Sequence, residues 1–362
     1  MISSVGIGIP PHDMTQASIK SLVKNIFSSE EERLVNRLLP VFDHAQIDRR
    51  QLAVDADWFK QAHSFEEKNT LYQKLAVKHS LQAIDACLTN QQYLQQTVPY
   101  EAIDMIIFVS STGLATPSLD TFLMSERPFR EDVKRMPLWG LGCAGGANGL
   151  ARAHDWIKAH PDQNVLLVCC ELCSLTFQKD DVQKSNIVGT ALFGDGAGAA
   201  LVIGDDSPLM AYGKGSKPRI ADTSSATKKN SHDVMGWRVT NAGLEVIFSK
   251  QIPALVRSFW QQHMTTFLHK SRIEPQSIQS YIAHPGGKKV LEAMAGVVQA
   301  PSDLFKHSYG VLQDHGNMSS ATILYVLDRW MQEPVSDKFP SILSALGPGF
   351  SSELLLLEWD ER

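Results

Sequence analysis

The sequence predicts a layered α/β fold, because buried strands alternate with helices along most of its 362 residues. The runs 103–109 and 165–170 are almost continuously apolar, as expected for strands that are covered on both faces. Hydrophobic residues make up 43% of the chain, which supplies a core for two domains or for one large duplicated unit.

The elements of the first half follow from apolar periodicity and turn residues. An apolar start that ends in a turn predicts a strand within 1–10, and helical periodicity predicts helices within 14–40 and 57–95. The strand at 103–109 ends at Ser-Ser-Thr-Gly, and Thr-Pro-Ser then caps a helix at 118–126. The other elements expected here are a helix at 143–160 and strands at 165–170 and 199–203.

The second half is expected to begin after a polar stretch. Residues 205–235 are rich in Ser, Lys, Asp and Gly, which is typical of a boundary. In both halves a glycine-containing helix start precedes a second glycine turn and a terminal apolar strand, so we predict two halves of similar order, 1–210 and 211–362. The later elements expected are helices near 244–270, 287–298 and 317–331 and strands at 280–283 and 354–359.

Composition excludes several classes of function. The net charge is −5 and the isoelectric point about 6.2, which argues against a nucleic-acid-binding face. The first ten residues lack a basic secretory segment, and no apolar run reaches the ~18 residues that span a bilayer, so we expect a cytoplasmic protein. An odd number of cysteines, five, fits reduced thiols. The Cys170/Cys173 pair lacks partners at zinc spacing, so we expect no metal.

Cys143 is the first candidate for chemistry. It follows an apolar segment and a glycine turn, and small residues after it open a helix. Unpaired N–H groups at a helix start favour a thiolate, and glycines leave room for a substrate. The alternative is a buried structural cysteine, which is common for a free thiol.

Two further segments carry polar groups suited to a reacting centre. His284 ends a buried strand before Pro-Gly-Gly, a position where α/β folds place ligands and catalytic groups. Asn317 begins a helix rich in small residues. Taken singly, His284 could be a hydrogen-bonded core residue and Asn317 an ordinary N-cap. Together, the imidazole and the amide form a pair of donors that would stabilise the enolate left when a malonyl thioester loses carbon dioxide. With a thiolate to hold an acyl group, this set predicts a decarboxylative Claisen condensation.

Five motifs resemble those of type III polyketide synthases, the chalcone and stilbene synthase superfamily on the thiolase fold, and most closely the bacterial alkylpyrone synthases. They occur in the family's order and span nearly the whole chain: Gly142–Gly146, Gly189–Gly196, Ala283–Gly287, Gly316–Ala321 and Gly347–Gly349. The resemblance implies an internally duplicated, five-layered αβαβα architecture and a homodimer. It also implies acyl-CoA and malonyl-CoA as substrates, with no further cofactor.

The resemblance also assigns roles to individual residues. Cys143 would carry the starter and the growing chain, and His284 would sustain its thiolate and, together with Asn317, promote decarboxylation of malonyl-CoA. Phe193 would be a gate between the CoA tunnel and the cavity. Other positions that would bind substrate are Ser111, Thr112, Thr116, Cys173, Thr176, Val246, Ser319, Gly347, Pro348 and Gly349, and Arg49 and Arg50 lie where basic residues meet the CoA phosphates.

Two departures from the plant pattern favour a long acyl starter over an aromatic one. Val246 stands where a second gate phenylalanine is expected, and Thr116 stands where a methionine reaches across the dimer. Both are smaller and would widen the throat. The alternatives that remain open are a priming ketosynthase of fatty-acid synthesis, which uses a carrier protein, and a non-catalytic acyl-binding relative. A degradative thiolase would need a second catalytic cysteine near the C-terminus, whereas the last cysteine here is Cys173.

Overall fold

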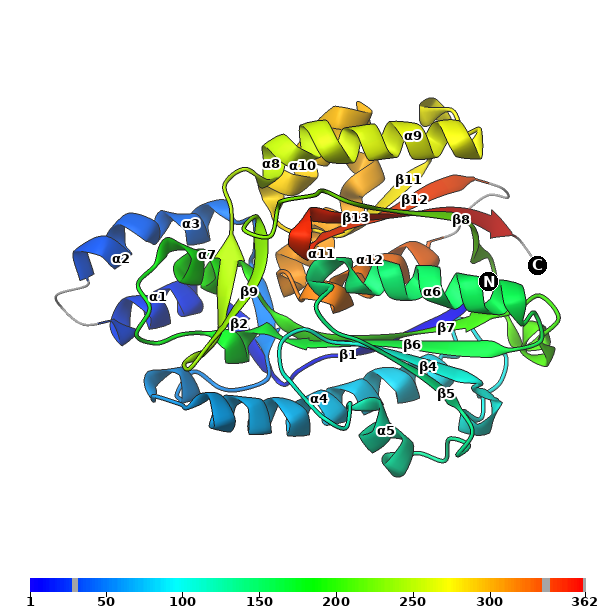
Figure 1. The fold of residues 1–362 in the computed structure, drawn as a ribbon, viewed down its shortest axis with the longest axis horizontal. Helices are drawn as coiled ribbons and strands as arrows, with labels where there is room; N and C mark the ends of the chain where they lie inside the picture. Colours follow the sequence, from blue (N-terminus) through cyan, green and yellow to red (C-terminus); the bar gives the residue numbers. More distant parts are fainter. Residues whose placement is uncertain (28–31, 334–338, 361–362) are drawn as a thin grey trace.

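Five layers of secondary structure make up the molecule in the computed structural model, which describes residues 1–27, 32–333 and 339–360 (Figure 1). Two large sheets enclose a central helical layer, formed mainly by α6 (Gly145–Ala159) and α12 (Thr322–Met331). Helix α4 (Phe65–Leu88) covers the outer face of one sheet and α9 (Gln261–Ser271) the outer face of the other. The predicted α/β layering is therefore confirmed.

The first sheet belongs entirely to the N-terminal half, and its strand order is β1-β7-β6-β4-β5. The parallel strands β4 and β6 and the antiparallel strand β7 are buried along their whole length, which explains their continuous apolar runs. The strands are β1 (Ile2–Gly8), β4 (Met105–Val109), β5 (Lys134–Leu138), β6 (Asn164–Leu172) and β7 (Asp195–Ile203). The sequence analysis missed β5, a short edge strand with charged residues.

The second sheet has the order β11-β12-β13-β8. It contains the predicted strands at 280–283 and 354–359 as β11 (Ser280–Ala283) and β13 (Ser351–Asp360). The sequence analysis missed β12 (Pro340–Gly347). It also treated 205–235 as a boundary, whereas β8 (Lys217–Thr227) forms the edge of this sheet and pairs with β13. Alternating exposure along β8 explains its polar composition.

The long helical segments were predicted too broadly. The segment 14–40 contains α1 (Gln16–Ile26) and α2 (Glu32–Leu38), and α3 (Pro40–His44) begins at its last residue. Residues 28–31 lie outside the described part. Within 57–95 the main helix is α4, preceded by the 3₁₀ turn Trp58–Lys60. Its start is set by a capping box, in which the Ser64 hydroxyl and the Glu67 carboxylate bond each other's backbone N–H groups.

The prediction of a helix near 244–270 is wrong for the beginning of that segment. Gly243–Phe248 forms β10, which pairs with β9 (Met235–Thr240) as an antiparallel hairpin. The helix begins only at α8 (Ile252–Leu255), with Pro253 in its first turn, and continues through a π-helical turn into α9. The remaining helices are α5 (Asp120–Glu126), α7 (Lys184–Leu192), α10 (Lys288–Val298) and α11 (Lys306–His315), and a small ribbon joins β2 (His12–Thr15) to β3 (Arg49–Leu52). None of the described helices is long and apolar enough to cross a membrane.

Candidate active site

Cys143 lies in a tight turn, Gly142–Ala144, that leads directly into α6. The turn requires glycine, because Gly142 has a positive φ of 46° and an added Cβ would lie 2.8 Å from the ring of Pro348. A Cβ at Gly146 would lie 2.4 Å from the Ser320 carbonyl oxygen. Small residues at the start of α6 therefore let this helix approach the Asn317 segment closely.

Asn317 is the polar side chain that the structure brings to the sulfur. Its Oδ1 lies 3.8 Å and its Nδ2 3.9 Å from Sγ of Cys143, although the two residues are 174 positions apart. The Ser319 N–H donates to Oδ1 at 2.8 Å, which fixes the amide plane. The expectation that Asn317 is only an N-cap is therefore incomplete, because its amide also faces the thiol.

His284 follows β11 and is 2% exposed. Its backbone N–H donates to the Ser344 carbonyl on β12 at 2.8 Å. That strand ends at Gly347, where a Cβ would lie 2.6 Å from the Leu141 carbonyl oxygen, so β12 joins the histidine to the Cys143 turn. Neither ring nitrogen of His284 has a hydrogen-bond partner among the described residues. Buried nitrogens are normally paired, so both remain available to a substrate.

Burial decides the protonation of the two groups. The surrounding protein desolvates the sulfur and raises the pKa of Cys143 to about 11, an effect that contacts with Ser319 and Asn317 oppose. Burial lowers the pKa of His284 to about 3. The structure thus holds a neutral thiol and a neutral imidazole at pH 7. Burial acts against the expected thiolate, because desolvation is the largest influence on the pKa of Cys143 and raises it.

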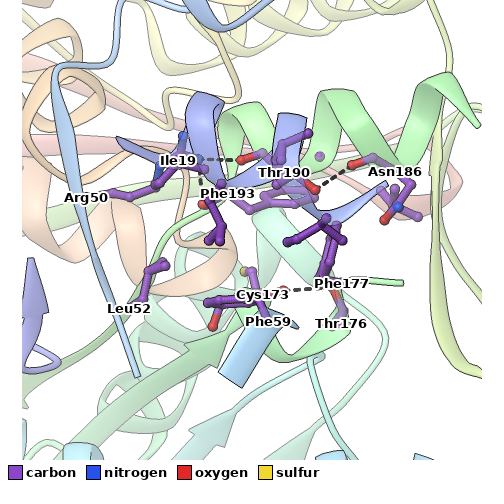
Figure 2. A pocket seen from close by; sticks show the side chains of 16 residues that line it. Ile19, Arg50, Leu52, Phe59, Cys173, Thr176, Phe177, Asn186, Thr190 and Phe193 are labelled. Carbon is purple, nitrogen blue, oxygen red and sulfur yellow. Dashed lines mark hydrogen bonds between the residues drawn. The ribbon is translucent and has the colours of Figure 1, made fainter. Parts of the chain in front are cut away.

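A mainly apolar cavity, drawn in Figure 2, is lined by Phe193, whose backbone pairs with that of Asn317. Five residues predicted to bind substrate line it: Arg50, Cys173, Thr176, Phe193 and Val246. A Cβ at Gly189 would lie 3.3 Å from both the Phe193 ring and the Val246 side chain, so these three residues meet at one point. The rest of the wall is mainly apolar and includes Ile19, Leu22, Val23 and Ile26 of α1, with Leu52, Phe59 and Phe177.

The remaining predicted residues are placed as follows. Ser111 and Thr112 follow β4, and the Ser111 hydroxyl accepts from the Gly142 N–H at 3.1 Å. Ser319 follows Asn317, and Pro348, between Gly347 and Gly349, contacts Gly142. Thr116 is not brought to the Phe193 cavity, because it lines a separate surface pocket beside Trp139. Arg49 is exposed and paired with Asp13.

Arg50 requires a correction. It was expected to bind CoA phosphates, but its side chain is fully buried and donates to the Thr190 and Phe193 carbonyls at 2.8 and 2.9 Å (Figure 2). The exposed member of the arginine pair is Arg49, because neighbouring residues of β3 point to opposite sides of the strand.

Both halves of the chain match models of one family. Residues 1–207 match the N-terminal domain of chalcone and stilbene synthases, and residues 223–358 match their C-terminal domain. The chain belongs to the chalcone and stilbene synthase family. It is a type III polyketide synthase with the thiolase fold, and hence an acyltransferase that condenses acyl-CoA starters with malonyl-CoA.

Individual relatives span the whole chain. The chalcone synthase-like protein of Bacillus subtilis (strain 168) is 44% identical over 361 residues, 99% of both chains. The α-pyrone synthesis polyketide synthase-like Pks18 of Mycobacterium tuberculosis is 27% identical and covers 99% of this chain and 91% of its own. The crystal structure of 1,3,6,8-tetrahydroxynaphthalene synthase from Streptomyces coelicolor, a bacterial type III polyketide synthase, superposes with a TM-score of 0.90 at 25% identity, covering 100% of this chain and 99% of its own. The family match therefore favours a type III polyketide synthase over the alternative of a priming ketosynthase of fatty-acid synthesis.

One buried acid of this polyketide synthase was missed by the sequence analysis. Glu171 on β6 is fully buried, and burial raises the pKa of its carboxyl group. It accepts from the Ser320 hydroxyl at 2.6 Å and from the Ser111 N–H and the Thr112 hydroxyl, both at 2.9 Å. Glu171 therefore joins the segment after Asn317 to the segment that supports Gly142. The signal in the sequence is a lone acid inside a buried strand. Among the described residues no group of three or more potential ligand side chains is arranged to hold a metal ion.

The neutral state of the Cys143 thiol predicts how alkylation depends on pH. Because only the thiolate reacts and the pKa of Cys143 is about 11, the rate of carboxamidomethylation by iodoacetamide should rise about tenfold per pH unit between about pH 7 and about pH 10. Cys143 should react before the other four cysteines, which are buried. Peptide mass spectrometry after timed quenching measures both effects. A rate that is flat from about pH 6 to about pH 9 would instead show a thiolate paired with protonated His284.

Proposed function

We propose that Cys143, His284 and Asn317 divide the condensation between them. As the Cys143 sulfur attacks the starter thioester, its proton passes to the departing sulfur of coenzyme A, which leaves as a thiol. Malonyl-CoA then loses carbon dioxide, and the enolate oxygen accepts hydrogen bonds from the His284 N–H and the Asn317 amide. The enolate carbon attacks the acyl carbonyl, which forms the new carbon–carbon bond and returns the sulfur. The observation that carries this assignment is the Asn317 amide, whose Oδ1 and Nδ2 both lie within 3.9 Å of the sulfur.

Protonation supports this assignment of His284. A pKa of about 3 leaves the ring neutral, so one nitrogen carries a proton and can donate. The negative charge of the enolate passes to the Cys143 sulfur when that sulfur leaves the acyl carbon, and the sulfur then takes up a proton. Because loss of carbon dioxide supplies the nucleophile, we propose that the reaction needs no metal or redox cofactor.

For the starter we propose a long-chain fatty acyl-CoA. The support is the cavity of Figure 2, whose walls are mainly apolar. Cys173, Thr176 and the meeting point of Phe193 and Val246 form part of its wall. A valine at that point leaves more room than a second aromatic ring. The product we propose is a pyrone or resorcinol, and the relationship to Pks18, an α-pyrone synthesis protein by name, favours the pyrone.

A series of starters tests this proposal, with butyryl-, octanoyl-, dodecanoyl-, palmitoyl- and benzoyl-CoA each supplied with malonyl-CoA. We expect the long acyl starters to give the highest kcat/KM, with pyrones identified by mass. Preference of the wild-type enzyme for benzoyl-CoA or butyryl-CoA would overturn the long-chain proposal.

Filling the cavity should change the preference for chain length. Leu22 is half-buried and lines the cavity from α1, so Leu22→Trp should lower kcat/KM for palmitoyl-CoA by at least about tenfold while changing butyryl-CoA little. The matched control is Asn25→Trp on the exposed side of the same helix, for which we expect the wild-type profile. Equal losses for all starters with Leu22→Trp would place the acyl chain elsewhere.

We also propose a homodimer and a role for Arg49. The outer side of β5 is an unpaired edge in the described structure, and exposed apolar side chains lie beside it: Leu114 (37%), Phe122 (42%) and Trp139 (51%). Sedimentation should give a dimer for the wild type and a monomer for Trp139→Glu, and a dimer that survives the substitution would show that another face is used.

Arg49, exposed near the cavity wall, remains our candidate for the CoA phosphates. The free state of all five cysteines fits the reducing cytoplasm that we propose as its location.

A further inference from the structure

The end of α7 is closed by two side chains. An α-helix leaves its last carbonyl groups without partners inside the helix. Here Thr190 and Phe193 accept from Nη1 of Arg50 at 2.8 and 2.9 Å, and Ala191 accepts from Nε2 of Gln16 at 3.0 Å. Arg50 and Gln16 also bond each other, through Nη2 and Oε1. A positive charge at the C-terminus of a helix is favourable, so Arg50 fixes this end by charge as well as by geometry.

The carbonyl of Leu192, which lies in the chain among these bonded carbonyls, binds Asn317. The Leu192 carbonyl accepts from the Asn317 N–H at 2.8 Å, and the Gly194 N–H donates to the Asn317 carbonyl at 3.0 Å. Phe193 and Asn317 thereby form an isolated parallel bridge between the two halves of the chain. The backbone of Asn317 consequently has the position that residues 192–194 give it.

The aliphatic part of the Arg50 side chain lies between two turns that pack against each other, one around Gly194 and one around Gly316. An added Cβ at Gly194 would lie 3.3 Å from Cβ of Arg50 and 2.3 Å from the His315 carbonyl oxygen. An added Cβ at Gly316 would lie 3.7 Å from Cδ of Arg50 and 2.8 Å from the Leu192 carbonyl oxygen. Both turns are packed against one another and against this side chain, so a shift of Arg50 would move them together.

Arg50 keeps its charge despite complete burial. Burial lowers the pKa of its guanidinium to about 9, while the charge of nearby Asp195 opposes that change. Asp195 is itself held by the Ala53 N–H at 2.7 Å and the Ser174 N–H at 2.8 Å. A buried charge requires partners, and apart from Asp195 those of Arg50 are the Thr190 and Phe193 carbonyls and Gln16.

We propose that Arg50 is the positioning residue for decarboxylation: its guanidinium fixes the 190–194 turn, which in turn sets the place of the Asn317 amide beside the Cys143 sulfur. This rests on the proposed role of Asn317. Arg50 lines the cavity proposed for the acyl chain and is not among the groups that contact the Cys143 sulfur, so it acts on decarboxylation through the 190–194 turn. The prediction from sequence that Arg50 binds CoA is thereby replaced by a role inside the protein.

The test separates three steps in the Arg50→Met variant, which keeps much of the stem and removes the donors. Loading of Cys143 from palmitoyl-CoA is measured by intact mass, release of carbon dioxide from malonyl-CoA without starter measures decarboxylation, and pyrone formation measures condensation. We expect decarboxylation and condensation to fall about 100-fold, since a shift of about 1 Å in a catalytic group can cost that much. Loading should stay within about threefold of the wild type. The KM for malonyl-CoA should change less than kcat.

Two further variants keep the test decisive if Arg50→Met does not fold. Gln16→Ala leaves the guanidinium but removes its Oε1 partner and the Ala191 donor, and should lower decarboxylation selectively by a smaller factor. Arg50→Lys should recover part of the activity, because an ammonium can reach fewer carbonyls. Arg127→Met is the matched control, since Arg127 also donates to a backbone carbonyl, whereas its other partner is Asp85 and it lies between α4 and α5.

The outcomes distinguish this proposal from the proposed function. A wild-type enzyme that neither loads Cys143 nor decarboxylates malonyl-CoA would refute the proposed function. A wild type with both activities, together with folded Arg50→Met or Gln16→Ala proteins that keep full decarboxylation, would overturn the positioning role alone. Equal losses of loading and decarboxylation would also overturn it, because they would show general damage to the fold.

Discussion

The Cys143→Ala variant is expected to form no condensation product, with a loss of at least about 10,000-fold, but to retain measurable decarboxylation of malonyl-CoA. Loss of a nucleophile removes the covalent intermediate, which typically costs several orders of magnitude. The enolate donors do not depend on the sulfur, because His284 is carried by β11 and Asn317 is held by its contacts with Leu192 and Gly194. Product formation by mass and release of carbon dioxide, measured on the same preparation, check both parts.

The control is Cys87→Ala, since Cys87 is buried in α4, where its thiol donates to the Ser4 carbonyl and its carbonyl accepts from the Ser4 hydroxyl. It should condense at the wild-type rate. If Cys143→Ala loses decarboxylation as well, the sulfur takes part in that step and the division of roles proposed above is wrong.

Removal of the Asn317 amide should give the second large effect. Asn317→Ala is expected to lower decarboxylation by about 100- to 1000-fold, or about 2.7–4 kcal/mol, as for the loss of one oxyanion donor. In the structure the Ser319 N–H donates to Oδ1 of Asn317 at 2.8 Å. Asn317→Asp keeps an oxygen for this bond but places a negative charge opposite the enolate. It should therefore lose at least as much. Steady-state release of carbon dioxide from malonyl-CoA measures the effect.

Loading of the starter separates this role from general damage. Both Asn317 variants should still acylate Cys143, because that step depends on the thiol. Asn90→Ala is a suitable control, as it removes an amide that bonds the Val5 carbonyl outside the site. Full decarboxylation by Asn317→Ala would leave His284 as the sole donor and contradict the proposed pair.

The fold was predictable where the pattern is local. β4 and β6 are apolar throughout because helices cover both faces of their sheet, and that environment leaves a direct mark on the sequence. β10 could not be separated from a helix start, because its strand state comes from pairing with β9, a separate segment of the chain. β8 was taken for a boundary for a similar reason: its identity depends on β13, which follows more than 120 residues later.

The same distinction applies to the site. Cys143 and Asn317 could be named because glycine turns and small residues mark the starts of their segments. Glu171 could have been noticed as an acid within an apolar strand, but its partners Ser111, Thr112 and Ser320 come from other segments. Arg50 could not be interpreted from its neighbours, since an arginine pair has the same composition whichever member points inward.

By itself, the sequence determined the α/β class, the family motifs and the residue types available for the chemistry, because these are recorded in short segments. Only the tertiary structure decided the protonation of Cys143 and His284, the burial of Arg50 and the contact of Asn317 with the sulfur. Desolvation and contact between segments 174 residues apart depend on which atoms surround a group, and that is a property of the packed chain.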